Sequence, residues 1–457
     1  VILDGTYNIT ASINVPKNKV SIRGSGNATI LKRLYDSTDT DNGPTARGLI
    51  TLNGKSGCKI QGLQIDGTKS IYTASYNCGI YLYSYQGTSS DNTVTGNTCY
   101  NNNYGIYLNS SKRSTITGNT CYNNNYGIFL SSMYDSSPDD STVTGNTCTN
   151  NSYGIYLYLS NYNTVTGNTC NRNNYGIYLN SSYDNTITGN ACSSGYGIYL
   201  SNRSHTNTIT GNICNDHVRG ISLVSSSRNT VTGNTCNNNS TSGIRLDSSS
   251  DNTVTGNTCY NNNYGIYLNS SKRSTITGNT CYNNNYGIFL SSMYDSSPDD
   301  STVTGNTCTN NSYGIYLYLS NYNTVTGNTC NRNNYGIYLN SSYDNTITGN
   351  ACSSGYGIYL SNRSHTNTIT GNICNDHVRG ISLASSSRNT VTGNTCYNNS
   401  YGIHLDESSN NTIIGNTCIR GTGQIGNYST NQYTILLSGT DNNYNLISSN
   451  NCMGKAV

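Results

Sequence analysis

The sequence lacks much of what a compact enzyme or a membrane protein is built from. There is no Trp, and the 457 residues include only 2 Phe, 3 Met and 4 Pro. Only 33% of the residues are hydrophobic. No apolar run approaches the roughly 18 residues that a membrane-spanning helix needs, so we expect no membrane span.

Charged residues are also scarce. They make up 10% of the chain and leave a net charge of +3. Nucleic-acid-binding proteins carry a dense basic patch, so the composition gives no basis for nucleic-acid binding. A chain this polar resembles a disordered polypeptide by composition alone, and only its internal order argues otherwise.

What the sequence has instead is a repeat. A version of T-V/I-T-G-N-T-C occurs fifteen times and ends at Cys418, at intervals that are almost always 22 residues and twice 27. A fixed period of this length is the signature of a solenoid, in which each repeat packs only on its neighbours.

One repeat, residues 92–111, contains three short alternating segments at 93–95, 97–99 and 105–108. Gly and Asn separate them, and both residues tolerate the left-handed backbone of tight corners. Three strands and three corners predict an all-β fold: a single right-handed parallel β-helix of roughly 18 rungs, about 22 residues each, with capped ends.

The chain divides into three parts by composition and period. Residues 1–57 are predicted to form opening rungs and a polar cap, residues 58–418 the repeat body, and residues 419–457 the closing rungs and cap, because open sheet ends would otherwise polymerise. Residues 89–236 recur at 249–396 with one difference, Val224 against Ala384. A copy this close displays every candidate group twice, which favours an array over a unique active site.

Stacking such rungs predicts columns of like side chains. Asn97 and its equivalents should form a hydrogen-bonded corner ladder. The 18 cysteines should line up inside the coil, mainly as free, buried thiols, with scattered rung-to-rung disulfides as the alternative. A straight column does not offer the tetrahedral geometry of a zinc site, so we expect no metal.

An aromatic ladder is predicted on the outer face of the Gly-Ile-x-Leu strands. Such rings either stack on one another or form a contact surface for a sugar polymer or a second rod. The candidate binding residues are Tyr107, Phe129, Tyr156, Tyr178, Tyr199, Tyr267, Phe289, Tyr316, Tyr338 and Tyr359. Ser222, Arg245, Ser382 and His404 interrupt this ladder, and if any residues are catalytic they are those at these breaks.

A second array consists of outward Thr-x-Thr pairs. It is either an ordinary solvated strand face or a flat grid resembling the ice-binding face of β-solenoid antifreeze proteins. The candidate residues of this alternative begin with Thr93, Thr95, Thr115, Thr117, Thr142, Thr144, Thr164 and Thr166. A repeated insert at 131–140 and 291–300 is a corner bulge, with Asp135, Asp139 and Asp140 as weak Ca²⁺ candidates.

The unit NTVTGNTCYNNNYGIYL resembles the parallel β-helix repeat of the NosD-like family and of Asn-rich surface proteins of methanogenic archaea. The stretch GTYNITASINVPKNKVSIRGSGNATI resembles the opening rungs of pectate-lyase-like right-handed β-helices. The resemblance implies the fold more strongly than any activity. NosD-like proteins are linked to copper-site maturation, but 3 Met and 5 His without clustering do not supply the soft ligands that copper prefers.

These observations favour a non-catalytic extracellular or cell-surface rod that presents its Tyr and Thr ladders for assembly or for glycan contact. Ice binding and polysaccharide lysis or hydrolysis are the alternatives. We expect no cofactor, no catalytic residue and no nucleic-acid partner; the expected partners are another copy or a cell-surface polysaccharide. Asn-x-Ser/Thr sequons make N-glycans possible at Asn8, Asn27, Asn109, Asn180, Asn202, Asn340 and Asn410.

Overall fold

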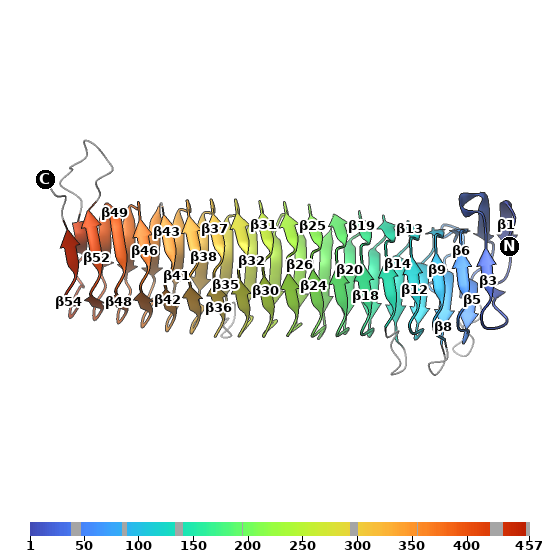
Figure 1. Cartoon of the computed structure of the whole chain (residues 1–457), viewed down its shortest axis with the longest axis horizontal. Coiled ribbons are helices and arrows are strands. Elements are labelled where there is room, and N and C mark those ends of the chain that lie inside the picture. Colours follow the sequence, from blue (N-terminus) through green and yellow to red (C-terminus); the bar gives the residue numbers. More distant parts are fainter. Residues whose placement is uncertain are drawn as a thin grey trace. The chain divides into compact units, whose positions relative to one another are not determined.

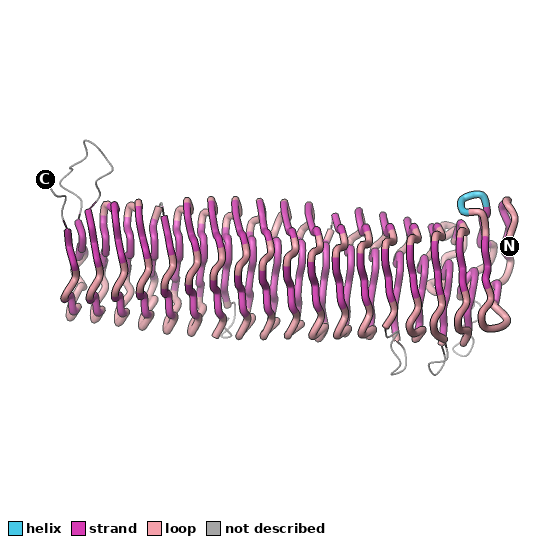
Figure 2. The backbone as a smooth tube through the Cα atoms, in the orientation of Figure 1, coloured by secondary structure: helices cyan, strands magenta, loops and turns pink. Residues whose placement is uncertain are grey.

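The computed structural model describes residues 1–37, 47–84, 89–132, 140–193, 195–292, 300–353, 355–420 and 433–453. Contacts divide the chain into two units, 1–230 and 231–457, which are described separately. Both are right-handed parallel β-solenoids, and together they hold about 18 turns of about 22 residues, as the sequence predicts. Among the described residues, the one helical element is the 3₁₀ turn η1 (Gly26–Ala28), drawn in cyan in Figure 2.

Each turn of the first unit contributes one strand to each of three parallel sheets, called A, B and C (Figure 1). Sheet A holds β1 (Gly5–Ile9), β4 (Thr29–Arg33), β7 (Gln64–Asp66), β10 (Thr98–Tyr100), β13 (Thr120–Tyr122), β16 (Thr147–Thr149), β19 (Thr169–Asn171), β22 (Ala191–Ser193) and β25 (Ile213–Asn215). Sheet B holds β2 (Ile13–Asn14), β5 (Gly48–Asn53), β8 (Cys78–Tyr83), β11 (Tyr104–Asn109), β14 (Tyr126–Ser131), β17 (Tyr153–Tyr158), β20 (Tyr175–Asn180), β23 (Tyr196–Ser201) and β26 (Arg219–Val224). Sheet C holds β3 (Ser21–Arg23), β6 (Lys59–Gln61), β9 (Thr93–Thr95), β12 (Thr115–Thr117), β15 (Thr142–Thr144), β18 (Thr164–Thr166), β21 (Thr186–Thr188) and β24 (Thr208–Thr210).

The second unit repeats the same three kinds of strand. Those of type A are β28 (Thr235–Asn237), β31 (Thr258–Tyr260), β34 (Thr280–Tyr282), β37 (Thr307–Thr309), β40 (Thr329–Asn331), β43 (Ala351–Ser353), β46 (Ile373–Asn375), β49 (Thr395–Asn399), β52 (Thr417–Arg420) and β55 (Asn451–Met453). Those of type B are β29 (Ser242–Asp247), β32 (Tyr264–Asn269), β35 (Tyr286–Ser291), β38 (Tyr313–Tyr318), β41 (Tyr335–Asn340), β44 (Tyr356–Ser361), β47 (Arg379–Ala384), β50 (Tyr401–Asp406) and β53 (Tyr433–Ser438). Those of type C are β27 (Thr230–Thr232), at the division, β30 (Thr253–Thr255), β33 (Thr275–Thr277), β36 (Thr302–Thr304), β39 (Thr324–Thr326), β42 (Thr346–Thr348), β45 (Thr368–Thr370), β48 (Thr390–Thr392), β51 (Thr412–Ile414) and β54 (Leu446–Ser448).

The core of each unit is a narrow column of apolar side chains. The inward residues Val94 and Cys99 have an exposed fraction of 0%. The register of the next turn places Ile116 beside Val94 and Cys121 beside Cys99. Because each strand is only a few residues long, each turn supplies few inward side chains, and a chain with only 33% hydrophobic residues fills this core.

Asparagine ladders hold the corners together. At the corner between sheets C and A, Asn119 Oδ1 accepts hydrogen bonds from the backbone N–H of Asn97 at 3.0 Å and from its Nδ2 at 3.1 Å. Asn119 in turn donates to Val94 O and to Asn146 Oδ1. This confirms the predicted ladder of Asn97, Asn119, Asn146 and Asn168. In this ladder the buried amides bond from turn to turn, each net bond contributing about 1 kcal/mol.

Two further asparagine ladders lie at the other corners, where the sequence did not predict them. The corner between sheets A and B carries Asn102, Asn124, Asn151 and Asn173. The corner between sheets B and C carries Asn163, Asn185, Asn207 and Asn229. Side-chain amides therefore bond successive turns to one another at all three corners.

A buried arginine, Arg33, links the first turns by hydrogen bonds. Arg33 is fully buried, and its guanidinium donates to Asn77 Oδ1 at 3.3 Å, to Arg47 O at 3.0 Å and to Cys78 O at 2.6 Å. Burial lowers the pKa of Arg33, and the nearby ring of Tyr35 at 4.5 Å offsets part of that effect. Capping of both ends, and the division at residues 57 and 418, remain predictions.

Candidate functional site

The outer face of sheet B carries two lanes of aromatic rings. The sequence predicts the lane of Tyr107, and the structure adds Tyr104, whose ring lies 4.9 Å from that of Tyr107 at 23°. The glycine between them makes this possible. A Cβ on Gly105 would lie 2.6 Å from Gly127 O and 3.4 Å from Cys121 Sγ, on the inner side. Only glycine fits there, so the residue before it turns outward as well.

The added lane runs beside the predicted one in both units. It consists of Tyr104, Tyr126, Tyr153, Tyr175 and Tyr196 in the first unit, and Tyr264, Tyr286, Tyr313, Tyr335 and Tyr356 in the second. The sequence analysis did not predict this lane, because a strict alternation of inward and outward side chains would point the Tyr before each Gly inward. The recurring Tyr-Gly-Ile triplet is the signal that reveals it.

Within the lanes the ring faces lie against one another. Tyr156 and Tyr178 have centroids 4.8 Å apart at 6°, and Tyr126 and Tyr153 have centroids 5.0 Å apart at 6°. Such pairs contribute about 0.5–1.5 kcal/mol each beyond the burial of area. Mutual stacking is confirmed, and flat pairs of this kind leave ring edges rather than ring faces toward solvent. Tyr199 is an exception, because its ring lies at 61°, 60° and 65° to those of Tyr175, Tyr178 and Tyr196.

The expectation of exposed rings is wrong for four candidate residues. Tyr107 is 5% exposed, and Phe129, Tyr267 and Phe289 are each 8% exposed, because the added lane covers them. The other six candidates are half-buried: Tyr156, Tyr178, Tyr199, Tyr316, Tyr338 and Tyr359. Whether the ladder binds a ligand stays a prediction.

The phenol oxygens are also engaged within the protein. Tyr107 Oη and Ser131 Oγ share a hydrogen bond of 2.8 Å, and Tyr178 Oη and Ser201 Oγ share another of 2.8 Å. Burial raises the pKa of many of these phenols well above the usual 10; that of Tyr100, in a smaller stack on sheet A, rises to about 12. The ladder is therefore first of all a structural element.

Arginines lie over rings at the two ends of the lanes in the second unit. The guanidinium of Arg379 lies 5.5 Å from the ring centroid of Tyr356 and 5.9 Å from that of Tyr401. That of Arg245 lies 4.8 Å from the centroid of Tyr267. Cation–π contacts of this kind contribute about 0.5–1 kcal/mol at exposed sites.

One break in the ladder gathers polar groups. His404 Nε2 donates to Ser438 Oγ at 2.8 Å, and Ser438 Oγ donates to Asp406 Oδ1 at 2.9 Å. Burial, and then the charge of Arg379, lower the pKa of His404 to about 4, so its imidazole is neutral at pH 7. The cluster brings a single carboxylate to sheet B, whereas glycosidic hydrolysis generally uses a pair.

The other residues near the breaks lie apart from this cluster. His377 is buried in the asparagine ladder, where its Nε2 lies 3.0 Å from Cys352 O, as an asparagine amide does in other turns. Asp247 forms an ion pair of 2.6 Å with Arg245 Nε in its own strand. Asp247 and His377 are thus engaged by partners other than those of His404.

The threonine candidates lie in register on sheet C. Thr93, Thr115, Thr142 and Thr164 form one row, and Thr95, Thr117, Thr144 and Thr166 the other. All eight are half-buried, with their strands' central Val or Ile facing the core. The predicted grid therefore exists, and its binding role stays a prediction.

The cysteine column is reduced. All eighteen cysteines are free thiols, and seventeen of them are buried. Fifteen inward cysteines follow the motif glycine, with Cys452 beside Cys418 at the last described turn. The hydrogen bond that joins Cys308 to Cys281 raises the pKa of Cys308, the one that joins it to Cys330 lowers it, and burial raises it. Neutral thiols of this kind act as small apolar filler, as predicted.

A polar groove lies at the corner between sheets A and B of the second unit. Its volume is about 660 Å³. Corner residues line it, among them Asn285, Asn310, Ser312, Arg332 and Asn334. The sequence analysis did not single out these residues, although the Asn-Asn-Asn triplets mark them.

Two smaller expectations concern the corners. Asn109 is fully buried, so its sequon is not open to glycosylation in the folded chain, while Asn202 is exposed. The carboxylates of Asp135 and Asp139, proposed as weak Ca²⁺ ligands, lie outside the described residues. In the parts of the chain that the structure describes, no helix is long and apolar enough to cross a membrane.

The comparisons with known proteins agree with this architecture. The model of the family described as "Periplasmic copper-binding protein (NosD)" matches residues 11–212, 179–297 and 293–454. The chain belongs to the NosD family. No curated protein matches the sequence.

Solved structures share the fold at low identity. The mannuronan C-5 epimerase AlgE6 A-module of Azotobacter vinelandii is 17% identical, with a TM-score of 0.50 over 71% of this chain and 88% of that one. The DFA-IIIase of Arthrobacter chlorophenolicus A6 without its lid is 16% identical, with a TM-score of 0.47 over 60% of this chain and 82% of that one. The first likeness shows a common β-helix fold, not a common activity.

The family description raises the question of copper, and the residues do not fit it. Among the described residues, no group of three or more His, Cys, Asp or Glu side chains is placed to hold a metal ion. The thiols that copper(I) would choose are buried in the core, with the exception of Cys452. We therefore derive no role for copper in this chain.

Proposed function

We propose that this NosD-family chain is a non-catalytic structural or adhesive solenoid that works outside the cytoplasm. Its repeated outer surfaces contact a glycan or another copy of the chain. The family is described as periplasmic, which supports a place outside the cytoplasm.

One observation carries the proposal. Every side chain between residues 89 and 236 except Val224 recurs 160 positions later, so each group within that stretch is displayed twice. An enzyme needs one constellation of groups around one bond, whereas an array gains from repetition. The polar cluster at His404 and Asp406, with one carboxylate, supports the same choice.

Incubation with polysaccharides tests the absence of catalysis. The purified chain is mixed with alginate, pectate and mixed-linkage β-glucan, and unsaturated products, new reducing ends and epimerised residues are measured. We expect none of them, and co-sedimentation with a polysaccharide or filaments under the electron microscope. Turnover that an Asp406→Asn exchange abolishes would replace this proposal with an enzyme.

Ice binding is the second candidate, because the threonine rows are in register. The regular pairs on β9, β12, β15 and β18 form an uncharged grid. The measurement is the gap between the melting and freezing points in the presence of the protein. A gap that disappears in a Thr144→Lys, Thr166→Lys variant would favour this function over the first.

A further inference from the structure

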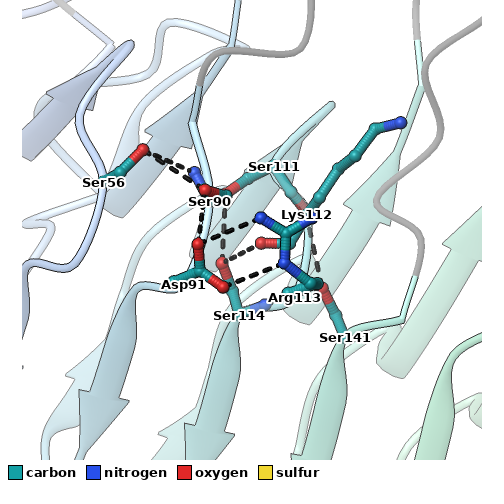
Figure 3. A network of polar contacts seen from close by, with 8 residues as sticks. All are labelled: Ser56, Ser90, Asp91, Ser111, Lys112, Arg113, Ser114 and Ser141. Carbon is teal, nitrogen blue, oxygen red and sulfur yellow. Dashed lines mark hydrogen bonds and ion pairs between the residues drawn. The ribbon is translucent and has the colours of Figure 1, made fainter.

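Most corners between sheets B and C are polar, and Figure 3 shows one of them. Arg113 Nε and Nη2 bind the two carboxylate oxygens of Asp91 at 3.0 and 3.1 Å, with serine hydroxyls around them. Asp91 and Arg113 have φ values of 56° and 46°, in the left-handed region. The corner position they share in successive turns requires that backbone.

Three turns place a tyrosine at this position, Tyr162, Tyr322 and Tyr444, and in the turns of Tyr162 and Tyr322 a leucine accompanies it. In the first unit this position holds Tyr162, with φ 59°. A second left-handed position lies earlier in the same corner. Other turns have a serine there, such as Ser110 or Ser181, whereas this turn has Leu159, with φ 51°. The second unit has Leu319 and Tyr322 at φ 50° and 60°. A bulky side chain in this region costs about 1–2 kcal/mol, which Asn or Asp largely avoids.

The departure builds an exposed aromatic patch in each unit. We call the four residues of each patch the corner cluster: Tyr158, Leu159, Tyr162 and Tyr183, and in the second unit Tyr318, Leu319, Tyr322 and Tyr343. Their exposed fractions are 39, 41, 52 and 43% in the first, and 38, 41, 53 and 43% in the second. The strained backbone therefore holds apolar side chains out toward solvent, where core packing does not repay the strain.

The rings of the corner cluster are arranged differently from those of the ladder. Tyr162 and Tyr183 meet edge to face, with centroids 5.9 Å apart at 84°, and Tyr322 and Tyr343 repeat this geometry. A perpendicular pair leaves at least one ring face turned away from its partner. The half-exposed rings thus present apolar faces, which the flat-stacked pairs of the ladder, such as Tyr156 and Tyr178, do not.

The size of the patch indicates the kind of ligand. Four side chains at these exposures present about 350 Å². A stable protein interface needs roughly 800 Å² from each partner, so a second copy does not fit this patch alone. A chain of sugar rings does, because each ring has a flat apolar face and a rim of hydroxyls.

The rim of the patch is polar and nearly uncharged. Asn161 Oδ1 accepts from the backbone of Tyr183 at 2.9 Å, and Asn180 and Ser181 follow on the next turn. Asp184 is the one charged residue within 158–163 and 180–185. Arg203 lies at the same corner of the following turn and offsets Asp184, so the rim has no net positive charge that would select an acidic sugar.

We propose that each corner cluster binds a segment of a neutral, hydroxyl-rich glycan. A sugar ring lies on the face of Tyr162 or Tyr183, with Leu159 beside it, and the second cluster binds in the same way. This inference rests on the glycan contact in the proposed function and moves it from the ladder to the corner. Two sites on one chain strengthen binding to a polymer by avidity.

The test is native electrophoresis of the full chain in gels containing mixed-linkage β-glucan, mannan or alginate. The variants carry residues that other turns of the chain use at these positions: Leu159→Ser and Tyr162→Asn, with Leu319→Ser and Tyr322→Asn. The control is Tyr178→Phe with Tyr338→Phe, in the ladder. Thermal unfolding of each variant is measured alongside.

We expect β-glucan or mannan to retard the parent chain and the ladder control. The fourfold corner variant should bind on the order of tenfold more weakly or less, with an unfolding temperature no lower than the parent's. Changing one cluster alone should give an intermediate loss.

Three results would overturn the inference. One is a corner variant that binds like the parent, another is loss of binding in the ladder control alone, and the third is stronger retention by alginate than by the neutral glycans. If no glycan retards the parent chain, glycan binding by the corner clusters is refuted. Filament formation would still support the proposed function in that case.

Discussion

Tyr178 and Tyr162 are the same kind of residue with opposite surroundings. Tyr178 lies in the ladder, where flat stacking on Tyr156 and a hydrogen bond to Ser201 satisfy its ring and its hydroxyl. Tyr162 lies at a strained corner and is 52% exposed. An aromatic residue in a repeat is thus not a ligand-binding residue by virtue of its type; the geometry of its neighbours decides.

The largest effect is expected from a substitution of Gly154, a glycine beneath the ladder. A Cβ on Gly154 would lie 2.5 Å from Gly176 O and 2.9 Å from Asn173 Nδ2. Gly154→Ala should therefore destabilise the chain by about 3 kcal/mol. Denaturant unfolding followed by circular dichroism measures this loss.

Gly167 is the matched control for that change. Its φ is 62°, but no atom lies within 4 Å of the position of a Cβ. Gly167→Ala should cost only the left-handed strain, about 1–2 kcal/mol, and Gly167→Asn less. Equal losses for Gly154→Ala and Gly167→Ala would contradict the packing argument for two aromatic lanes.

Removing one ring from each region compares them directly. Tyr156→Ala loses stacking on both sides and the bond from Asn180 to its hydroxyl, so we expect a loss of about 2–3 kcal/mol. Tyr162→Asn should leave stability unchanged or raise it by about 1 kcal/mol, because Asn accepts the left-handed backbone. Unfolding curves of the two variants settle the contrast, and a larger loss for Tyr162→Asn would reverse it.

Alkaline pH should weaken the aromatic stacks. Burial raises the pKa of Tyr100 to about 12, and it raises those of Tyr104 and Tyr156 further. The folded chain keeps these protons while the unfolded chain releases them near pH 10, so the contribution of the phenols to the free energy of unfolding is constant below pH 10 and falls above it. Denaturation midpoints at pH 8, 10 and 11 measure this; no change up to pH 11 would argue against buried phenols.

The smallest effect is expected from removing one ladder hydroxyl. Tyr178→Phe removes the hydrogen bond to Ser201 and leaves the ring in place. We expect a loss of about 0.5–1 kcal/mol, seen as a small shift in the denaturation midpoint. A gain in stability would mean that the hydroxyl faces water rather than serine.

The sequence alone predicts the coil, the inward Val, Cys and Ile columns and the ladder of Asn97, because period and alternation specify them directly. It does not predict the lane of Tyr104. Gly105 interrupts the alternation of inward and outward side chains, so that Tyr104 faces outward where a strict alternation would point it inward. The sequence also misses the exposure of Leu159 and Tyr162, which depends on backbone angles at a corner. The outward lane and the exposed corner residues both depend on local backbone geometry, which residue type alone does not predict.

The asparagine ladders have a direction. From Asn97 to Asn119 to Asn146, each side-chain carbonyl points back along the chain and accepts from the turn before it. Small dipoles aligned head to tail add up, as they do along an α-helix. Each unit therefore carries a built-in electrical polarity along its coil, negative toward its earlier turns, although its side chains bear little charge.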